Sequence, residues 1–276
     1  MILRILIILA LAGTIFGGAY LAVYELYIQP EVELKTDKQA PRPEPPVDPS
    51  IADFKDCLDV RNTKSPVEAV AAMERFLQVN PASSKRDEAR AIIGELNSAL
   101  FFSAKPTEEN TVLVKRGDSL ARISSHTKMS VELIVYLNKL QNDNIHPGQR
   151  LLAFPTDFRL SLKQREQKVV LMRDGKFFRQ YSAVSWPGKK PPVILPKQTA
   201  RVVEKTALTE KGIPPKPTSQ EYFGAFHTIG FPIPGHSLFS HSGDTSRPVP
   251  GGIELALSDM SEIAVLLPKG AQVTLE

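Results

Sequence analysis

The stretch TVLVKRGDSL at residues 111–120 decides the fold of the central part of the chain. It opens with the apolar pattern of a short strand, turns at Gly117 and enters a helix that Asp118 or Ser119 can cap. A second capped helix and a short closing strand follow it along the chain. This order predicts a βααβ module over residues 110–155, with its two strands paired antiparallel beneath the two helices.

The residue pattern of this module resembles that of the LysM domain. The pattern V-x-x-G-D-S-L-x-x-I, then S-V-E-x-x-x-x-L-N, then I-x-P-G-Q-x-L runs along its whole length. LysM domains bind glycans that contain N-acetylglucosamine, mainly peptidoglycan or chitin, between the first strand–helix loop and the second helix–strand loop. The resemblance implies a glycan-binding site of ten residues: Gly117, Asp118, Ser119, Leu120, Asn138, Leu140, Asn142, Asp143, Asn144 and Ile145.

The chemistry of these residues suits a glycan, and it also suits purely structural roles. Backbone amides and small polar side chains can bind acetamido groups, and apolar side chains can pack against sugar faces. Equally, Gly117 can serve only the turn, Asp118 and Ser119 only the cap, and Leu120 and Ile145 only the core. Both interpretations stay open for each single residue.

From residue 156 the pattern changes to strands. Two apolar runs flank the turn RDGK at residues 173–176 and predict a hairpin. The chain ends on a predicted helix, the turn PKG at residues 268–270 and a last strand. This layout over residues 156–276 resembles the mostly-β catalytic domain of the L,D-transpeptidases, which a LysM module often precedes.

The residues that carry transpeptidase chemistry are altered in this chain. The family's signature is Ser-His-Gly-Cys-Ile-Arg, in which the Cys is the acyl-accepting nucleophile, the His activates it and the Arg helps to hold the acyl donor. Counting back from the last helix aligns the final five positions of this signature with Pro250, Gly251, Gly252, Ile253 and Glu254. Glycine thus replaces the nucleophile, and the single cysteine, Cys57, lies far upstream. The resemblance therefore implies a degenerate, non-catalytic domain.

A serine enzyme is the alternative. His236 and His241 are both candidates for the family's other histidine: the spacing favours the first and the Ser-His-Ser-Gly context favours the second. Ser237, Ser240 and Ser242 lie close by in the sequence. A serine nucleophile also needs a general base and an orienting carboxylate, for which Asp244 and Glu254 are available.

Residues 51–104 predict helices. SPVE at residues 65–68 is a capping box with proline at the first helical position. Two helices with apolar stripes follow from it, and a shorter helix precedes them. The segment resembles a tetratricopeptide-type hairpin, which serves either as a packing element or spacer, or as a docking surface for a partner such as a cell-wall enzyme.

The N-terminus predicts a membrane anchor. No charged residue interrupts the twenty positions 5–24, and Arg4 precedes that run. This favours a transmembrane helix within residues 1–28, with residues 29–276 outside the cytoplasm. A cleaved signal peptide is the alternative. The proline-rich segment 29–50 then predicts an extended linker.

Composition limits the remaining possibilities. The net charge is +4 over 276 residues, and no basic run favours nucleic acid as a partner. His126 and His146 lack metal-ligand spacing, so neither a metal nor a cofactor is expected. The sequence therefore predicts an α+β multidomain protein of the cell envelope, attached to the cytoplasmic membrane by a single helix and bound to peptidoglycan through its LysM module.

Overall fold

The computed structural model describes residues 48–187, 194–240 and 251–276. The described residues from Pro49 to Glu276 belong to one compact unit. In chain order its elements are α3 (Ser50–Thr63), α4 (Pro66–Val79), α5 (Arg86–Phe102), β1 (Thr111–Leu113), α6 (Leu120–Thr127), α7 (Val131–Leu137), β2 (Arg150–Leu152), β3 (Phe158–Lys163), β4 (Lys168–Arg173), β5 (Lys176–Ser182), β6 (Gln198–Arg201), β7 (Glu204–Leu208), α8 (Gln220–Phe223), β8 (Phe226–Gly230), β9 (Leu238–Phe239), β10 (Ile253–Glu254), α9 (Leu257–Leu266) and β11 (Gln272–Leu275).

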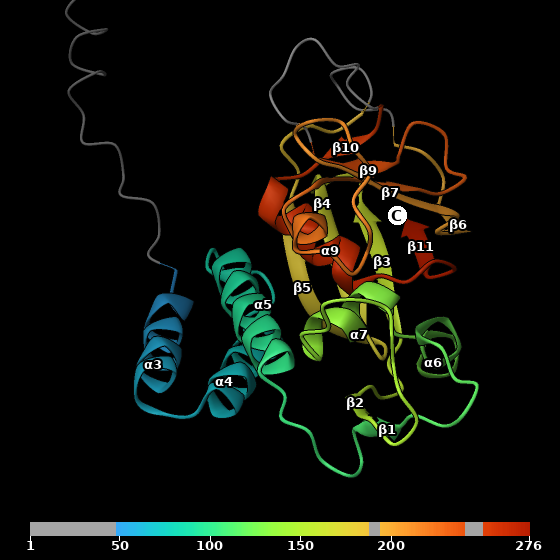
Figure 1. Ribbon diagram of the computed structural model, residues 1–276. Coiled ribbons are helices and arrows are strands. Elements are labelled where there is room, and N and C mark those ends of the chain that lie inside the picture. Colours follow the sequence, from blue (N-terminus) through green and yellow to red (C-terminus); the bar gives the residue numbers. More distant parts are fainter. Residues whose placement is uncertain (1–47, 188–193, 241–250) are drawn as a thin grey trace, which may run out of the picture. The chain divides into compact units, whose positions relative to one another are not determined.

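Helices α3, α4 and α5 pack side by side, and α4 contacts both of the others (Figure 1). The predicted capping box is confirmed at the start of α4: the Ser65 side chain accepts a hydrogen bond from the backbone N–H of Glu68, whose carboxylate accepts one from the Ser65 N–H. These reciprocal bonds satisfy two backbone donors that the first helical turn would leave free. Phe54, Phe76 and Ile93 join the three helices in one apolar cluster.

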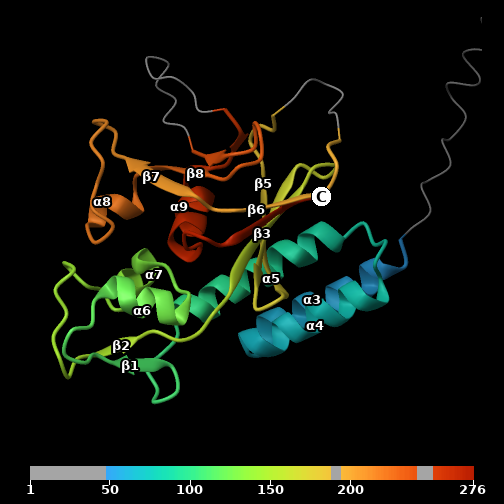
Figure 2. The ribbon, with the colours of Figure 1, turned by 90° about the vertical axis from the view of Figure 1, so that its right-hand side faces the viewer.

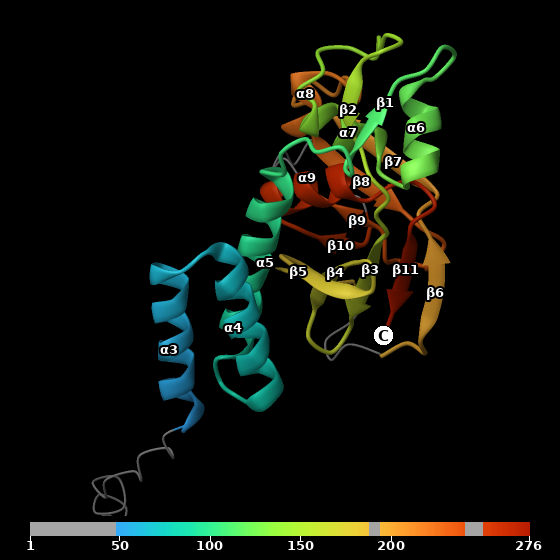
Figure 3. The ribbon, with the colours of Figure 1, turned by 90° about the horizontal axis from the view of Figure 1, so that it is seen from below.

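Helix α5 lies directly against strand β5 (Figure 3). The close approach depends on Gly94, because a Cβ at that position would lie 2.8 Å from Cγ of Arg179. The Asn97 side chain donates a hydrogen bond of 2.9 Å to the Phe178 carbonyl. Lys168 forms an ion pair with Asp87 at 2.5 Å. The helical segment is therefore packed onto the sheet and does not act as a free spacer.

The expected βααβ arrangement is present. Strands β1 and β2 pair antiparallel, with Val112 opposite Leu151. The Ser119 and Ser130 hydroxyls accept backbone hydrogen bonds at the starts of α6 and α7, at 3.2 Å and 2.9 Å. Lys128 is the C-cap of α6, and its φ of 58° places it in the left-handed region.

The C-terminal part consists of two sheets. The five-stranded sheet has the order β5-β4-β3-β11-β6, and the four-stranded sheet has the order β10-β9-β8-β7. The predicted hairpin β4–β5 is confirmed, and its turn residues Asp174 and Gly175 have φ of 50° and 79°. Positive φ at both central positions is what a type I′ turn requires. The last strand, β11, lies parallel to β3 and antiparallel to β6.

Helix α9 joins the sheets to the βααβ module. It contacts both β8 and α7 (Figure 2), and the Ser130 hydroxyl donates a hydrogen bond to the Val265 carbonyl. One hydrophobic core runs without interruption from Phe101 on α5, through Leu133 on α7, to Ile263 on α9 and the strands of the larger sheet. The module and the C-terminal part thus share their core.

The membrane-spanning helix is a correction to the predicted fold class. Among the described residues, no helix is long and apolar enough to cross a bilayer. The longest of them, α5, has 17 residues and carries charged side chains on its exposed face, whereas a spanning helix needs about 20 apolar residues. Residues 1–28 and most of the linker 29–50 lie outside the described residues. We therefore correct the fold class to α+β with a mostly-β C-terminal part, and the single-pass localisation is corrected with it.

Candidate functional site

The first predicted glycan-binding loop follows β1. Gly117 has a φ of 86°, and no atom lies within 4 Å of the position its Cβ would take. The Asp118 carboxylate accepts the backbone N–H of Lys115 at 2.8 Å, and Ser119 caps α6. Leu120 is buried in the core. The backbone of this loop is therefore open on the side of Gly117, while its side chains hold the turn and the cap.

The second predicted loop follows α7. Asn138 at its start has a structural role, because its amide accepts from the Leu152 N–H at 2.7 Å and donates to the Leu152 and Ile134 carbonyls. Leu140 and Ile145 are half-buried against the core. These residues therefore stabilise the module.

Three exposed polar residues form the tip of the second loop: Asn142, Asp143 and Asn144. The Asn142 side chain accepts a hydrogen bond of 3.0 Å from the Asn144 N–H. The side chains of Asp143 and Asn144 make no hydrogen bond within the described part of the chain that fixes the loop. Of the ten predicted positions, Asp143 and Asn144 are therefore the ones whose side chains can bind a ligand without losing a described hydrogen bond.

Strand pairing brings the two loops close together. The Val114 N–H donates to the Gln149 carbonyl at 2.8 Å, and the Gly148 N–H donates to the Val114 carbonyl at 2.9 Å. The start of the first loop therefore lies beside the end of the second.

The position that corresponds to the transpeptidase nucleophile is shaped for glycine. Gly252 has a φ of 141°, and a Cβ there would lie 2.1 Å from the Ser237 carbonyl oxygen. That same oxygen accepts the Ile253 N–H at 2.8 Å. Gly251 differs, since nothing lies within 4 Å of its Cβ position. A side chain at position 252 therefore requires the backbone to move.

Glu254, at the position of the family's arginine, is occupied by a local contact. Its carboxylate accepts a hydrogen bond of 3.1 Å from the Ser185 hydroxyl, and its N–H donates to the Ser185 carbonyl at 3.0 Å. Ile253 beside it is fully buried. Pro250 and His241 lie outside the described residues.

The serine and histidine side chains described near this region do not form a nucleophile–base pair. The His236 ring is buried, with Nδ1 at 2.8 Å from the Pro234 carbonyl oxygen and the ring edge-on to Trp186. The Ser237 hydroxyl donates to the Gly251 carbonyl, and the Ser240 hydroxyl accepts the backbone N–H of His227. Ser242 and Asp244 are outside the described ranges.

Comparison with known families identifies the central module. Residues 112–153 match the family model of the LysM domain. This segment is a LysM domain. The resemblance found in the sequence is confirmed, and LysM domains bind N-acetylglucosamine-containing glycans such as peptidoglycan. No curated protein matches the chain in sequence.

Solved structures that resemble the chain include several L,D-transpeptidases. An L,D-transpeptidase from Mycobacterium smegmatis is 11% identical at a TM-score of 0.31, covering 47% of this chain and 63% of its own. One from Enterococcus faecium is 18% identical at a TM-score of 0.30, covering 44% of this chain and 50% of its own. One from Xylanimonas cellulosilytica is 14% identical at a TM-score of 0.30, covering 63% of this chain and 100% of its own. This chain thus spans less than two thirds of the first two. At these identities and TM-scores the likeness carries no conclusion about the fold or the activity of this chain.

A buried polar cluster joins the LysM domain to the smaller sheet. Glu132 on α7 forms an ion pair with Lys205 on β7 at 3.0 Å and accepts a hydrogen bond of 3.1 Å from the Tyr222 hydroxyl. The His227 ring packs against the Tyr222 ring, with centroids 4.8 Å apart. Burial, and then the charge of Lys205, lowers the pKa of His227 to about 4. No pattern in the sequence connects these four residues, because they lie far apart along the chain.

Two of the clefts that the described residues form lie beside the LysM domain. The first, of about 550 Å³, is lined by Glu95, Ser98, Ala99, Phe102, Tyr136, Arg179, Phe223, Ser261, Glu262 and Val265. Within this lining Arg179 forms an ion pair with Glu262 at 2.9 Å, and burial raises the pKa of that carboxyl. The second cleft, of about 530 Å³, lies beside α6 and is rich in cationic side chains.

Proposed function

We propose that the protein binds peptidoglycan through its LysM domain, and that its C-terminal part serves as a non-catalytic domain that binds wall peptide or a protein partner. The LysM match over residues 112–153 carries the first half of this proposal. The proposed place of action is the cell envelope, where this polymer lies.

The geometry of the two LysM loops supports glycan binding. The open face at Gly117 leaves backbone groups accessible. The Asp143 carboxylate and the Asn144 amide are exposed on the second loop, whose end is bonded to the start of the first. A few polar groups next to half-buried apolar residues such as Leu140 suit the mixed surface of a sugar.

The contact between Gly252 and Ser237 supports the non-catalytic role. Cysteine transpeptidation needs a thiolate, and a cysteine side chain at position 252 would overlap the Ser237 backbone. Glu254 also carries the charge opposite to that of the family's arginine, so it repels a carboxylate where the arginine would attract one. Cys57 lies on α3, where burial raises the pKa of its thiol.

Co-sedimentation of the full chain with purified peptidoglycan tests this function. The full chain is used because the LysM domain shares its core with the rest of the unit. We expect the unaltered protein to pellet with the polymer and Asp143→Tyr to bind about tenfold more weakly, a loss of about 1.4 kcal/mol. Asp59→Tyr, the same change at an exposed site on α3, is the matched control and should bind normally. Protein that stays in the supernatant at every polymer concentration contradicts the proposal.

A further inference from the structure

The second cleft lies between the LysM domain and the edge of the larger sheet. Its lining comes from α6, from the start of β3, from β6 and from the turn before β11, and it consists of Ala121, Ser124, Ser125, Lys128, Asp157, Phe158, Arg159, Arg201, Pro268, Lys269, Gly270, Ala271 and Gln272. Its volume is about 530 Å³. It includes none of the predicted glycan-binding residues and none of the signature positions.

The charge of this cleft is strongly positive. Four cationic side chains and one carboxylate line it, which leaves a net charge of +3. Asp157 is already paired with Arg159, whose Nε lies 2.8 Å from the carboxylate. Lys128 and Lys269 are exposed, and neither forms an ion pair with any residue that the structure describes. The cleft therefore offers cationic groups that lack a partner of opposite charge.

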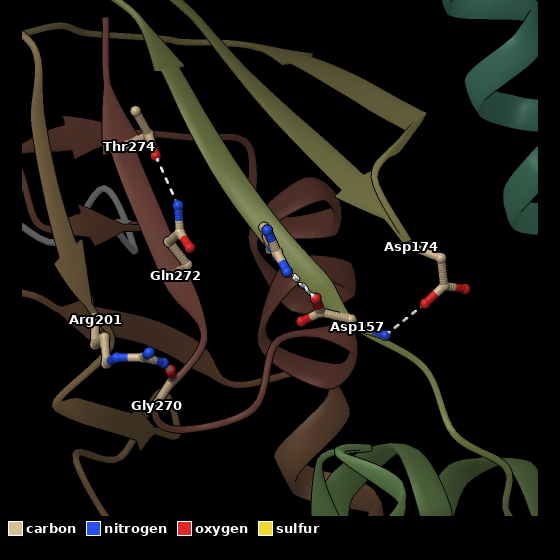
Figure 4. Close-up of polar contacts among 7 residues, drawn as sticks. Asp157, Asp174, Arg201, Gly270, Gln272 and Thr274 are labelled. Carbon is tan, nitrogen blue, oxygen red and sulfur yellow. Dashed lines mark hydrogen bonds and ion pairs between the residues drawn. The ribbon is translucent and has the colours of Figure 1, made fainter.

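Arg201 is held in place at the cleft. One of its terminal nitrogens donates a hydrogen bond of 2.8 Å to the Gly270 carbonyl, and Figure 4 shows its side chain extended toward that residue. A guanidinium group has five N–H donors, so most of them stay available to a ligand. A fixed guanidinium loses less entropy when it binds a carboxylate than a freely rotating one does.

Lys128 occupies an unfavourable backbone conformation at the cleft. It ends α6 with φ 58° and ψ 12°, in the left-handed region where glycine is the usual residue. For a side chain with a Cβ this conformation costs about 1 kcal/mol. A lysine at this position therefore places a cation beside the cleft at the expense of stability.

We infer that this cleft binds the carboxylate groups of a peptide attached to the glycan that the LysM domain holds. The inference rests on the proposed function and adds a second contact to it. Helix α6 starts at Leu120, directly after the Gly117 loop, and Ala121 already lines the cleft. Ala121 is the second residue of α6, so the cleft begins within one helical turn of the Gly117 loop, and the eight residues of the helix extend about 12 Å from there to Lys128. Peptidoglycan carries its peptides as side branches on the sugars, and these peptides bear free carboxylates.

Calorimetric titration of the full chain with three ligands tests the inference. The ligands are a disaccharide-peptide fragment of peptidoglycan with free carboxylates, the same fragment with its carboxylates amidated, and an N-acetylglucosamine oligomer without peptide. We expect the free acid to bind about tenfold more tightly than the amide at low salt, and the difference to shrink at high salt, because screening weakens exposed charge interactions.

Two variants assign the effect to the cleft. Lys128→Gly removes a charge while relieving the left-handed conformation, so it should not destabilise the fold. Lys269→Gln removes a second charge from an exposed turn. Each should lose most of the preference for the free acid while binding the oligomer normally. Lys55→Gln, an exposed change on α3, is the control and should leave all three affinities unaltered.

The outcomes separate this inference from the proposed function. If the oligomer binds but the free acid and the amide bind equally, or if the two variants keep the preference, the carboxylate site is wrong and the LysM proposal stands. If the oligomer does not bind but the free acid binds in a manner that depends on Lys128, the cleft is supported and glycan recognition is wrong. Binding of a phosphodiester wall polymer in place of the peptide fragment also overturns the inference.

Discussion

The carbonyl oxygen of Ser237 occupies the space that a side chain at Gly252 would need. The distance from this oxygen to the Cβ position of Gly252 is 2.1 Å, and the Gly252 φ of 141° is itself a conformation that favours glycine. The same oxygen accepts the Ile253 N–H, so the two backbone segments are bonded where they touch. The loss of the signature cysteine is therefore accompanied by a backbone arrangement that leaves no room for one.

Gly252→Cys should destabilise the protein without creating a transpeptidase. We expect a loss of more than about 2 kcal/mol, since left-handed strain and a backbone overlap act together. Urea denaturation measures the loss. Gly251→Cys is the matched control, because nothing lies within 4 Å of its Cβ position, and it should cost much less. Equal stability of the two variants would show that the Ser237 contact is unimportant.

Ser237 and Ser240 should not be acylated. The Ser237 and Ser240 hydroxyls are bonded to backbone groups, and the His236 ring faces a carbonyl oxygen and Trp186. Without a base in contact, a serine hydroxyl is a weak nucleophile. Incubation with a carbapenem should leave the intact mass of the protein unchanged. A stable adduct mapped to either serine would favour the serine-enzyme alternative.

The ion pair between Glu132 and Lys205 should be essential for attaching the LysM domain to the smaller sheet. The Lys205 side chain is only 4% exposed, so Lys205→Met leaves a buried carboxylate without its partner, at a cost of about 3–5 kcal/mol. Adding Glu132→Gln removes that unpaired charge. The double variant should therefore be more stable than the sum of the two single losses implies. Additive losses in a denaturation-based mutant cycle would argue against the coupling.

The buried His227 should make stability fall in mild acid. Its pKa of about 4 lies below the usual value of 6.5, so between these values the unfolded chain takes up a proton that the folded protein does not. Stability is then fully present above pH ~6.5 and is lost as the pH falls toward ~4, by about 3 kcal/mol at most. His227→Phe keeps an aromatic ring against Tyr222 and should flatten this dependence. The comparison is made by denaturation at several pH values, and parallel curves for the two proteins would contradict it.

Local chemistry explains which parts of the fold the sequence predicts. The Ser65 capping box and the Asp174–Gly175 turn each depend on neighbouring residues, so their patterns are visible in the chain. The LysM spacing is of the same kind. The pairing of β11 with β3 is not visible, because it joins residues more than a hundred positions apart.

In the candidate site, too, the sequence predicts local features and misses contacts between distant segments. Resemblance indicates the two LysM loops, but only the structure separates the exposed Asp143 from Asn138, which binds the backbone of β2. The Ser237 carbonyl at Gly252 and the cationic cleft beside α6 both depend on contacts between distant segments. His227 has no motif of its own in the sequence, because its partners Glu132 and Lys205 come from distant segments.

The most direct test of the account is to follow the backbone amide NMR signals of the full chain during titration with an N-acetylglucosamine oligomer. If the LysM domain binds glycan as proposed, the signals of residues 117–120 and 142–145 should shift in a saturable manner, while those of β3, β4 and β5 stay in place. The absence of any shift at saturating oligomer, or shifts confined to residues 156–276, would contradict the central claim.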